Sequence, residues 1–129
     1  MNLAPVTETF GQDDQSWLAS AHGTNTARPL TLDTSAFTPA THYPNGYFPS
    51  GLPLGKITAT GLYGPYDNTA ADGREVLAGF LFTAVSAPSV NTIDPQGALF
   101  WHGAVVEAKL PRPVDAAGKA DVAGFVKFF

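Results

Sequence analysis

The chain has 129 residues, with seven Lys and Arg against eleven Asp and Glu, and it contains no cysteine. A single domain of this length can bury a core, and the missing cysteines exclude a disulfide scaffold and a thiolate metal site. The few basic residues are scattered singly, which excludes the basic footprint that nucleic acids and anionic membrane surfaces require.

Only 14% of the residues are charged, against about a quarter in ordinary domains, which favours a surface partly covered by partners. The first six residues lack the positive region of a signal peptide, and the longest apolar run, residues 76–85, is too short to span a bilayer. We therefore expect a soluble protein that is neither secreted by a recognisable signal nor anchored in a membrane.

Residues 1–27 are mostly polar, small and acidic, so they cannot bury enough apolar surface to offset the entropy of ordering. We predict that they form a flexible N-terminal arm that is dispensable for folding. Isolated apolar residues along it would act as binding anchors: Leu3, Val6, Phe10, Trp17 and Leu18.

Residues 28–129 read as the folded domain. Residues 30–33 alternate as a short strand, Asn45-Gly46 is a strong turn signal in a segment rich in proline, and residues 54–62 read as a second strand. Because residues 46–62 carry almost no charge, we expect the low-charge body to form any contact between copies of the chain.

The second half of the chain contains the strongest strand signals. Asp72-Gly73 predicts a hairpin turn, and the nearly continuous apolar stretch 76–87 predicts a strand at the centre of the core. Another strand is expected at 99–108, with Gly103 as a bulge, and a final strand at 125–129.

The helix that we expect spans residues 114–122, after Pro113, with Val114, Gly118 and Val122 on one face. The predicted fold is therefore mainly β with one short C-terminal helix (α+β), in a small single domain that carries a disordered N-terminal arm.

Catalytic patterns are missing from the sequence. His22, His42 and His102 are far apart and lack metal-ligand spacing, and no nucleophile motif is present. We therefore expect no enzyme activity, no catalytic residue, no bound metal and no cofactor.

Several short stretches follow one another in an order that resembles the lambda-type bacteriophage head decoration (capsid cement) proteins. They are Leu32-Asp33-Thr34-Ser35, residues 51–57, Tyr63-Gly64-Pro65-Tyr66-Asp67 and residues 72–81. An apolar strand, an aromatic strand, a short helix and a terminal strand follow in the family, and residues 28–129 match that order. The segment 35–52 departs from the family pattern, because it is longer than the corresponding family segment and richer in proline and aromatic residues.

The resemblance implies a viral structural protein on the outer surface of the expanded capsid. It implies a homotrimer that binds the major capsid protein through N-terminal arms and stabilises the head against internal DNA pressure, with neither nucleic acid nor membrane as a partner. The alternative is a small carbohydrate- or surface-binding module of a virion, whose aromatic residues stack on sugars. The residues that would form such a platform are Tyr43, Tyr47, Phe48, Tyr63 and Tyr66.

Overall fold

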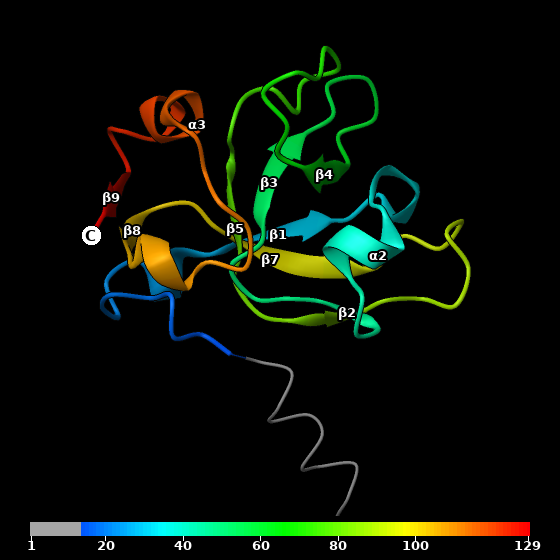
Figure 1. The fold of residues 1–129 in the computed structure, drawn as a ribbon, viewed down its shortest axis with the longest axis horizontal. Coiled ribbons are helices and arrows are strands. Elements are labelled where there is room, and N and C mark those ends of the chain that lie inside the picture. The colour runs from blue at the N-terminus through cyan, green and yellow to red at the C-terminus, as the bar shows by residue number, and fades with distance from the viewer. Residues whose placement is uncertain (1–13) are drawn as a thin grey trace, which may run out of the picture.

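The computed structural model describes residues 14–129, and its centre is a five-stranded antiparallel sheet (Figure 1). The strand order across the sheet is β1-β7-β5-β3-β4. Their bounds are β1 Arg28–Thr31, β3 Pro53–Lys56, β4 Tyr63–Pro65, β5 Gly79–Leu81 and β7 Gln96–Phe100.

Two small sheets flank the large one. The first pairs β2 (Tyr47–Phe48) with β6 (Val85–Ser86) in antiparallel fashion. The second pairs β8 (Gly103–Val105) with β9 (Val126–Phe128) in parallel. The parallel pairing is possible because the connection between β8 and β9 is long enough to carry a helix back across the molecule.

The helices are short. The α-helices are α2 (Pro39–His42) and α3 (Ala116–Asp121), and the 3₁₀ turns are η1 (Thr24–Thr26), η2 (Thr34–Ala36) and η3 (Glu107–Lys109). The fold is thus mainly β with short helices in one small domain, which confirms the predicted fold class. One prediction was incomplete, since α2 is a second helix that begins at Pro39 in the proline-rich segment.

The two faces of the large sheet carry separate hydrophobic clusters, because successive side chains of a strand point to opposite faces. On β5, Phe80 belongs to one cluster and Leu81 to the other, and on β7 Phe100 and Leu99 divide in the same way. A sheet buried on both faces has central strands that are apolar throughout rather than alternating, which explains the continuous apolar stretch in the sequence.

Several predicted strands are shorter in the structure. The stretch 54–62 ends as a strand at Lys56, because residues 57–62 reverse the chain: the amide of Ile57 donates to the Leu62 carbonyl at 2.8 Å. These residues form the hairpin between β3 and β4. The predicted hairpin at Asp72-Gly73 is wrong, since β4 and β5 lie on opposite sides of β3 and do not pair.

The two long apolar strands are also divided. Residues 76–87 contain β5 and β6, which belong to different sheets, and residues 99–108 contain the end of β7 and then β8. Gly103 is the first residue of β8, directly after the corner at residues 101–102, rather than a bulge within one strand.

The C-terminal helix forms within the predicted segment and buries the predicted residues. The helix is shorter than the predicted span 114–122, because Asp115 caps its start and Val122 is the C-cap; Val114, Gly118 and Val122 are nevertheless all buried. Asp115 is the N-cap, and its carboxylate accepts a hydrogen bond from the Gly118 amide at 2.8 Å. At the other end, the Asp121 carboxylate accepts from the Leu77 amide at 2.9 Å, which fixes the helix to the chain just before β5.

Candidate binding surface

The predicted arm residues divide into two groups. Leu3, Val6 and Phe10 lie outside the described residues. Trp17 and Leu18 are part of the folded body, and Trp17 is only 1% exposed. Trp17 is therefore a core residue and not, as predicted, an exposed anchor on a flexible arm.

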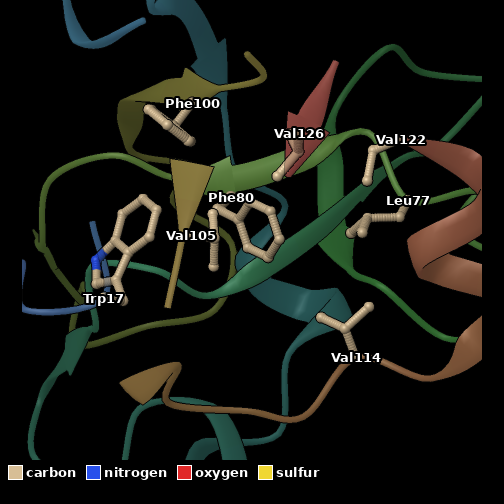
Figure 2. Close-up of a cluster of buried hydrophobic side chains, with 8 residues drawn as sticks. All are labelled: Trp17, Leu77, Phe80, Phe100, Val105, Val114, Val122 and Val126. Atoms are coloured by element: carbon tan, nitrogen blue, oxygen red, sulfur yellow. The ribbon is translucent and has the colours of Figure 1, made fainter. Parts of the chain in front are cut away.

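Trp17 is held in the core by ring contacts. Figure 2 shows its indole beside Phe80 in a cluster that also includes Val105 and Phe100. The centroid of the Trp17 ring lies 5.8 Å from the centroid of the Phe80 ring and 5.2 Å from that of the Phe100 ring. The pair with Phe100 has an edge-to-face arrangement. Aromatic pairs in this geometry add to the stabilisation that burial supplies.

The polar edge of the indole is also satisfied. The Trp17 Nε1 donates to Ser50 Oγ at 2.9 Å, and the Ser50 hydroxyl donates in turn to the Phe82 carbonyl at 2.7 Å. Gln15 Nε2 donates to the same carbonyl at 2.8 Å. A buried N–H without a partner would be costly, so Ser50 is part of what allows Trp17 to lie inside.

Leu18 continues the attachment through the backbone. It forms an antiparallel bridge with Val105, the Val106 amide donates to the Trp17 carbonyl at 2.7 Å, and the Ala19 amide donates to the Ala104 carbonyl at 3.1 Å. Residues 17–19 thus lie along the edge of β8 opposite β9. The arm boundary after residue 27 is wrong, because residues 14–27 include a segment built into the body.

Among residues 14–129, the most exposed aromatic residues lie at the C-terminal end of the fold. Phe125 is 54% exposed and Phe129 is 67% exposed, on either side of β9. They border an open groove of about 540 Å³, which we call the C-terminal groove. Its lining is Ser20, His22, Gly103, Ala104, Ala123, Gly124, Phe125, Val126, Lys127 and Phe129.

Strand β9 also offers main-chain groups at this groove. Within residues 14–129 it pairs with β8 alone, and its second edge is only partly open, because the Val126 amide already donates to the Val122 carbonyl at 2.8 Å. An open edge can accept a strand from another chain, and exposed aromatic residues beside it add apolar contact area. The sequence predicted the terminal strand but did not identify this surface, because nothing in the stretch 125–129 shows which edge is covered.

The five aromatic residues of the alternative sugar platform do not share one exposed surface. Phe48 is fully buried, and Tyr43 packs against it with ring centroids 4.8 Å apart. The Tyr66 hydroxyl donates to the Asp115 carboxylate at 2.6 Å, beside α3. Tyr47 lines a small groove of about 200 Å³ with neighbours from α2 and the loop at 111–112. The predicted platform is therefore wrong.

The histidines occupy two places. His42 ends α2, where its Nδ1 accepts from the Thr38 amide at 2.9 Å; burial lowers its pKa, and the nearby Arg112 lowers it further. His22 and His102 lie together, with ring centroids 4.9 Å apart, although 80 positions separate them in the sequence. Within residues 14–129, no group of three or more His, Cys, Asp or Glu side chains could hold a metal ion.

None of the helices formed by residues 14–129 is long and apolar enough to cross a membrane. Comparisons with protein-family models, with curated proteins and with solved structures found no match to this chain.

Proposed function

We propose that this chain is a capsid decoration protein, which binds the outside of an expanded phage head as a trimer and opposes the separation of its subunits. The resemblance in sequence is the starting point, and the order of elements supports it. The stretch Leu32-Asp33-Thr34-Ser35 forms the turn after β1, the apolar run contains β5, and β7, α3 and β9 follow in the expected order.

The first of these stretches has a local physical role. Asp33 caps the turn η2: its carboxylate accepts from the Ser35 amide at 3.2 Å and from the Ser35 hydroxyl at 2.6 Å. Thr34 is buried, and its hydroxyl donates to the Ile93 carbonyl at 2.6 Å. These hydrogen bonds fix the turn that follows β1 and attach it to residue 93, in the loop between β6 and β7. The stretch therefore has a structural role in this fold.

The observation that carries the proposal is the C-terminal edge of the body. It combines a strand edge that is partly open within residues 14–129 with two exposed phenylalanines, on a chain with few charges. Such a surface suits a protein partner better than a small polar ligand, because it offers main-chain pairing and apolar area together. In the proposed function the partner at this edge is the capsid subunit.

Binding of this kind stabilises a shell by simple thermodynamics. A trimer that bridges several subunits binds the intact lattice and not the separated subunits, so its binding free energy opposes their separation. Three equivalent contacts in one particle bind at high effective concentration once the first has formed, which makes the attachment much tighter than one contact alone.

The docking surface is tested by a matched pair of double variants, each added to expanded shells that lack decoration. Phe125→Ser with Phe129→Ser removes the exposed aromatic residues beside β9. Val90→Ser with Ile93→Ser removes exposed apolar residues of similar accessibility, 50% and 54%, from the loop between β6 and β7.

We expect the first variant to bind the shells at least about tenfold more weakly than the unaltered protein, and the second to bind normally. All four side chains are exposed, but the Phe125 ring also packs against Trp101 with centroids 5.8 Å apart, so the thermal midpoint of each variant is measured beside its binding. Equal binding by the two variants would contradict a role for the C-terminal edge.

A further inference from the structure

Two His-Gly pairs that are distant in the sequence meet in the fold. His22-Gly23 lies in the turn before η1, and His102-Gly103 lies at the corner between β7 and β8. The two imidazole rings have centroids 4.9 Å apart and planes inclined by 54°. Rings at this inclination are not stacked face to face.

The glycines explain how the backbones come so close. Gly23 has φ +84°, and a Cβ there would meet the carbonyl oxygen of His102. Gly103 has φ +148°, and a Cβ there would meet the carbonyl oxygen of His22. Each glycine thus makes room for the backbone of the other pair, and both φ values favour glycine. The contact between the two turns is therefore a specific feature that holds the two imidazoles together.

We propose that His22 and His102 form a binding site for a divalent transition metal ion, with Zn²⁺ or Ni²⁺ as the class of ligand. Zinc binds imidazole nitrogen at about 2.1 Å, and the ring centre lies about 1.1 Å behind that nitrogen, so two imidazoles at a tetrahedral angle have centres about 5 Å apart. The observed centroid separation of 4.9 Å is close to this value.

The surroundings position His102. The ring centroids of Trp101 and His102 lie 5.5 Å apart. The Trp101 Nε1 donates to the Thr26 carbonyl at 2.8 Å, which fixes the indole beside His102. The Arg28 guanidinium lies 4.3 Å above the Trp101 ring. His102 is half-buried in this layer, whereas His22 is exposed at the C-terminal groove.

The nearby charges and donors decide which ions fit. Ca²⁺ and Mg²⁺ take oxygen ligands, whereas the two side chains here offer imidazole nitrogen, so the site disfavours both ions. The basic groups nearby, Lys127 in the groove and Arg28 over Trp101, oppose any cation. Imidazole nitrogens bind borderline metals such as Zn²⁺, Ni²⁺ and Cu²⁺ in spite of this. Two protein ligands leave the other coordination positions to water, or to a carboxylate or imidazole of a protein that docks at the groove.

Such an ion would join two parts of the chain. His22 follows the segment that bridges β8, and His102 precedes β8 itself, so a metal bound to both would fix residues 14–27 more firmly to the sheet. Because the bound ion favours the folded state alone, it should raise the thermal transition.

The test is a calorimetric titration of the full chain, without an affinity tag, with Zn²⁺ and Ni²⁺, and with Ca²⁺ as the hard-cation control. We expect one Zn²⁺ or Ni²⁺ ion per chain, no binding of Ca²⁺, and a transition raised by several degrees at saturating Zn²⁺. His102→Gln and His22→Gln should each weaken binding at least about tenfold and remove the thermal shift. His42→Gln, on the distant helix α2, is the matched control and should bind as the unaltered chain does.

His22 is exposed, so His22→Gln should fold normally and its result is decisive even where His102→Gln disturbs the fold. Failure of Zn²⁺ to bind, or binding that is weakened equally by His42→Gln, would overturn the proposal. Because the experiment contains no capsid, its outcome is independent of the proposed decoration function.

Discussion

Trp17 shows how one residue can attach a polar segment to a core. The segment around it contains Asp14, Gln15 and Ser16, which resemble a solvated terminus. The indole nevertheless buries a large apolar area between Phe80 and Phe100, and its N–H has a buried partner in Ser50. The free energy from burial of a single large aromatic side chain is enough to order a few flanking residues.

The first prediction concerns the loss of this residue. Trp17→Ala should lower the free energy of unfolding by about 3–5 kcal/mol, because it removes the buried ring and leaves a cavity. The midpoint of thermal unfolding, followed by circular dichroism, should fall by more than about 10 °C. Trp17→Phe keeps an aromatic ring but loses the donor to Ser50, so its loss should be smaller. A Trp17→Ala protein as stable as the unaltered chain would contradict the core position.

A second prediction at this scale concerns the cap of α3. The hydroxyl of Tyr66 and then the amide of Gly118 donate to the Asp115 carboxylate, and both lower its pKa. A carboxyl whose pKa is lower in the folded state stabilises the fold above its unfolded pKa of about 4, and this contribution is lost as the pH falls through the folded pKa. Asp115→Asn should therefore lower the thermal midpoint at pH 7, and the difference should close below pH 4.

The partner residue supplies the control. In a Tyr66→Phe background the carboxylate has lost the donor that lowers its pKa most. The effect of Asp115→Asn at pH 7 should then be smaller, as a double-mutant cycle of thermal midpoints would show. A difference in midpoint between the unaltered protein and the Asp115→Asn variant that is constant from pH 7 to pH 2 would refute the assigned pKa direction.

At the scale of elements, local patterns were predictable and distant pairings were not. The face of α3 and the buried position of β5 follow from residue spacing and from continuous apolar character. The division of residues 76–87 between two sheets depends on which strands pair with β5 and β6. A single sequence does not contain that information, since any apolar strand can pair with several others.

The candidate site depended on the same distant contacts. Trp17 meets Ser50 across 33 positions, and His22 meets His102 across 80. The polar composition of residues 1–27 predicted an arm, but composition describes the average of a segment and one tryptophan hardly changes it. The glycine that follows each histidine was the available signal, because adjacent turns that pack closely need residues without a side chain.

The third prediction compares two truncations. A chain that lacks residues 1–27 loses Trp17 and the bridge between Leu18 and Val105, whereas a chain that lacks residues 1–13 keeps both. The longer truncation should unfold at a clearly lower temperature than the shorter one, by more than about 10 °C. Equal midpoints in a calorimetric scan would restore the predicted boundary of the arm at residue 27.

For the whole molecule, the low proportion of charged residues has one cause in the stretch 46–62 and another at the C-terminal groove. Residues 46–62 carry little charge because most of the stretch 50–57 is buried in the chain's own core. This weakens the reason for expecting a contact between copies there. At the C-terminal groove the apolar residues are exposed instead, so the surface available to partners lies at the other end of the fold.

The fourth prediction concerns assembly. The proposed decoration protein should be a trimer in solution, with three times the mass of the chain by light scattering at micromolar concentration. The chain that lacks residues 1–13 should give the same result, because the contact is expected in the body. A monomer in both cases would contradict the trimer, although it would leave the described fold unchanged.

The central claim is that the protein binds assembled, expanded capsids. The direct measurement adds the purified full chain to expanded shells that lack decoration and to unexpanded shells of the same phage. Bound protein is then quantified after sedimentation, and shell stability is measured by heating. We predict saturable binding to expanded shells alone and a higher temperature of shell disruption. Absence of binding, or binding that leaves the disruption temperature unchanged, would contradict the claim.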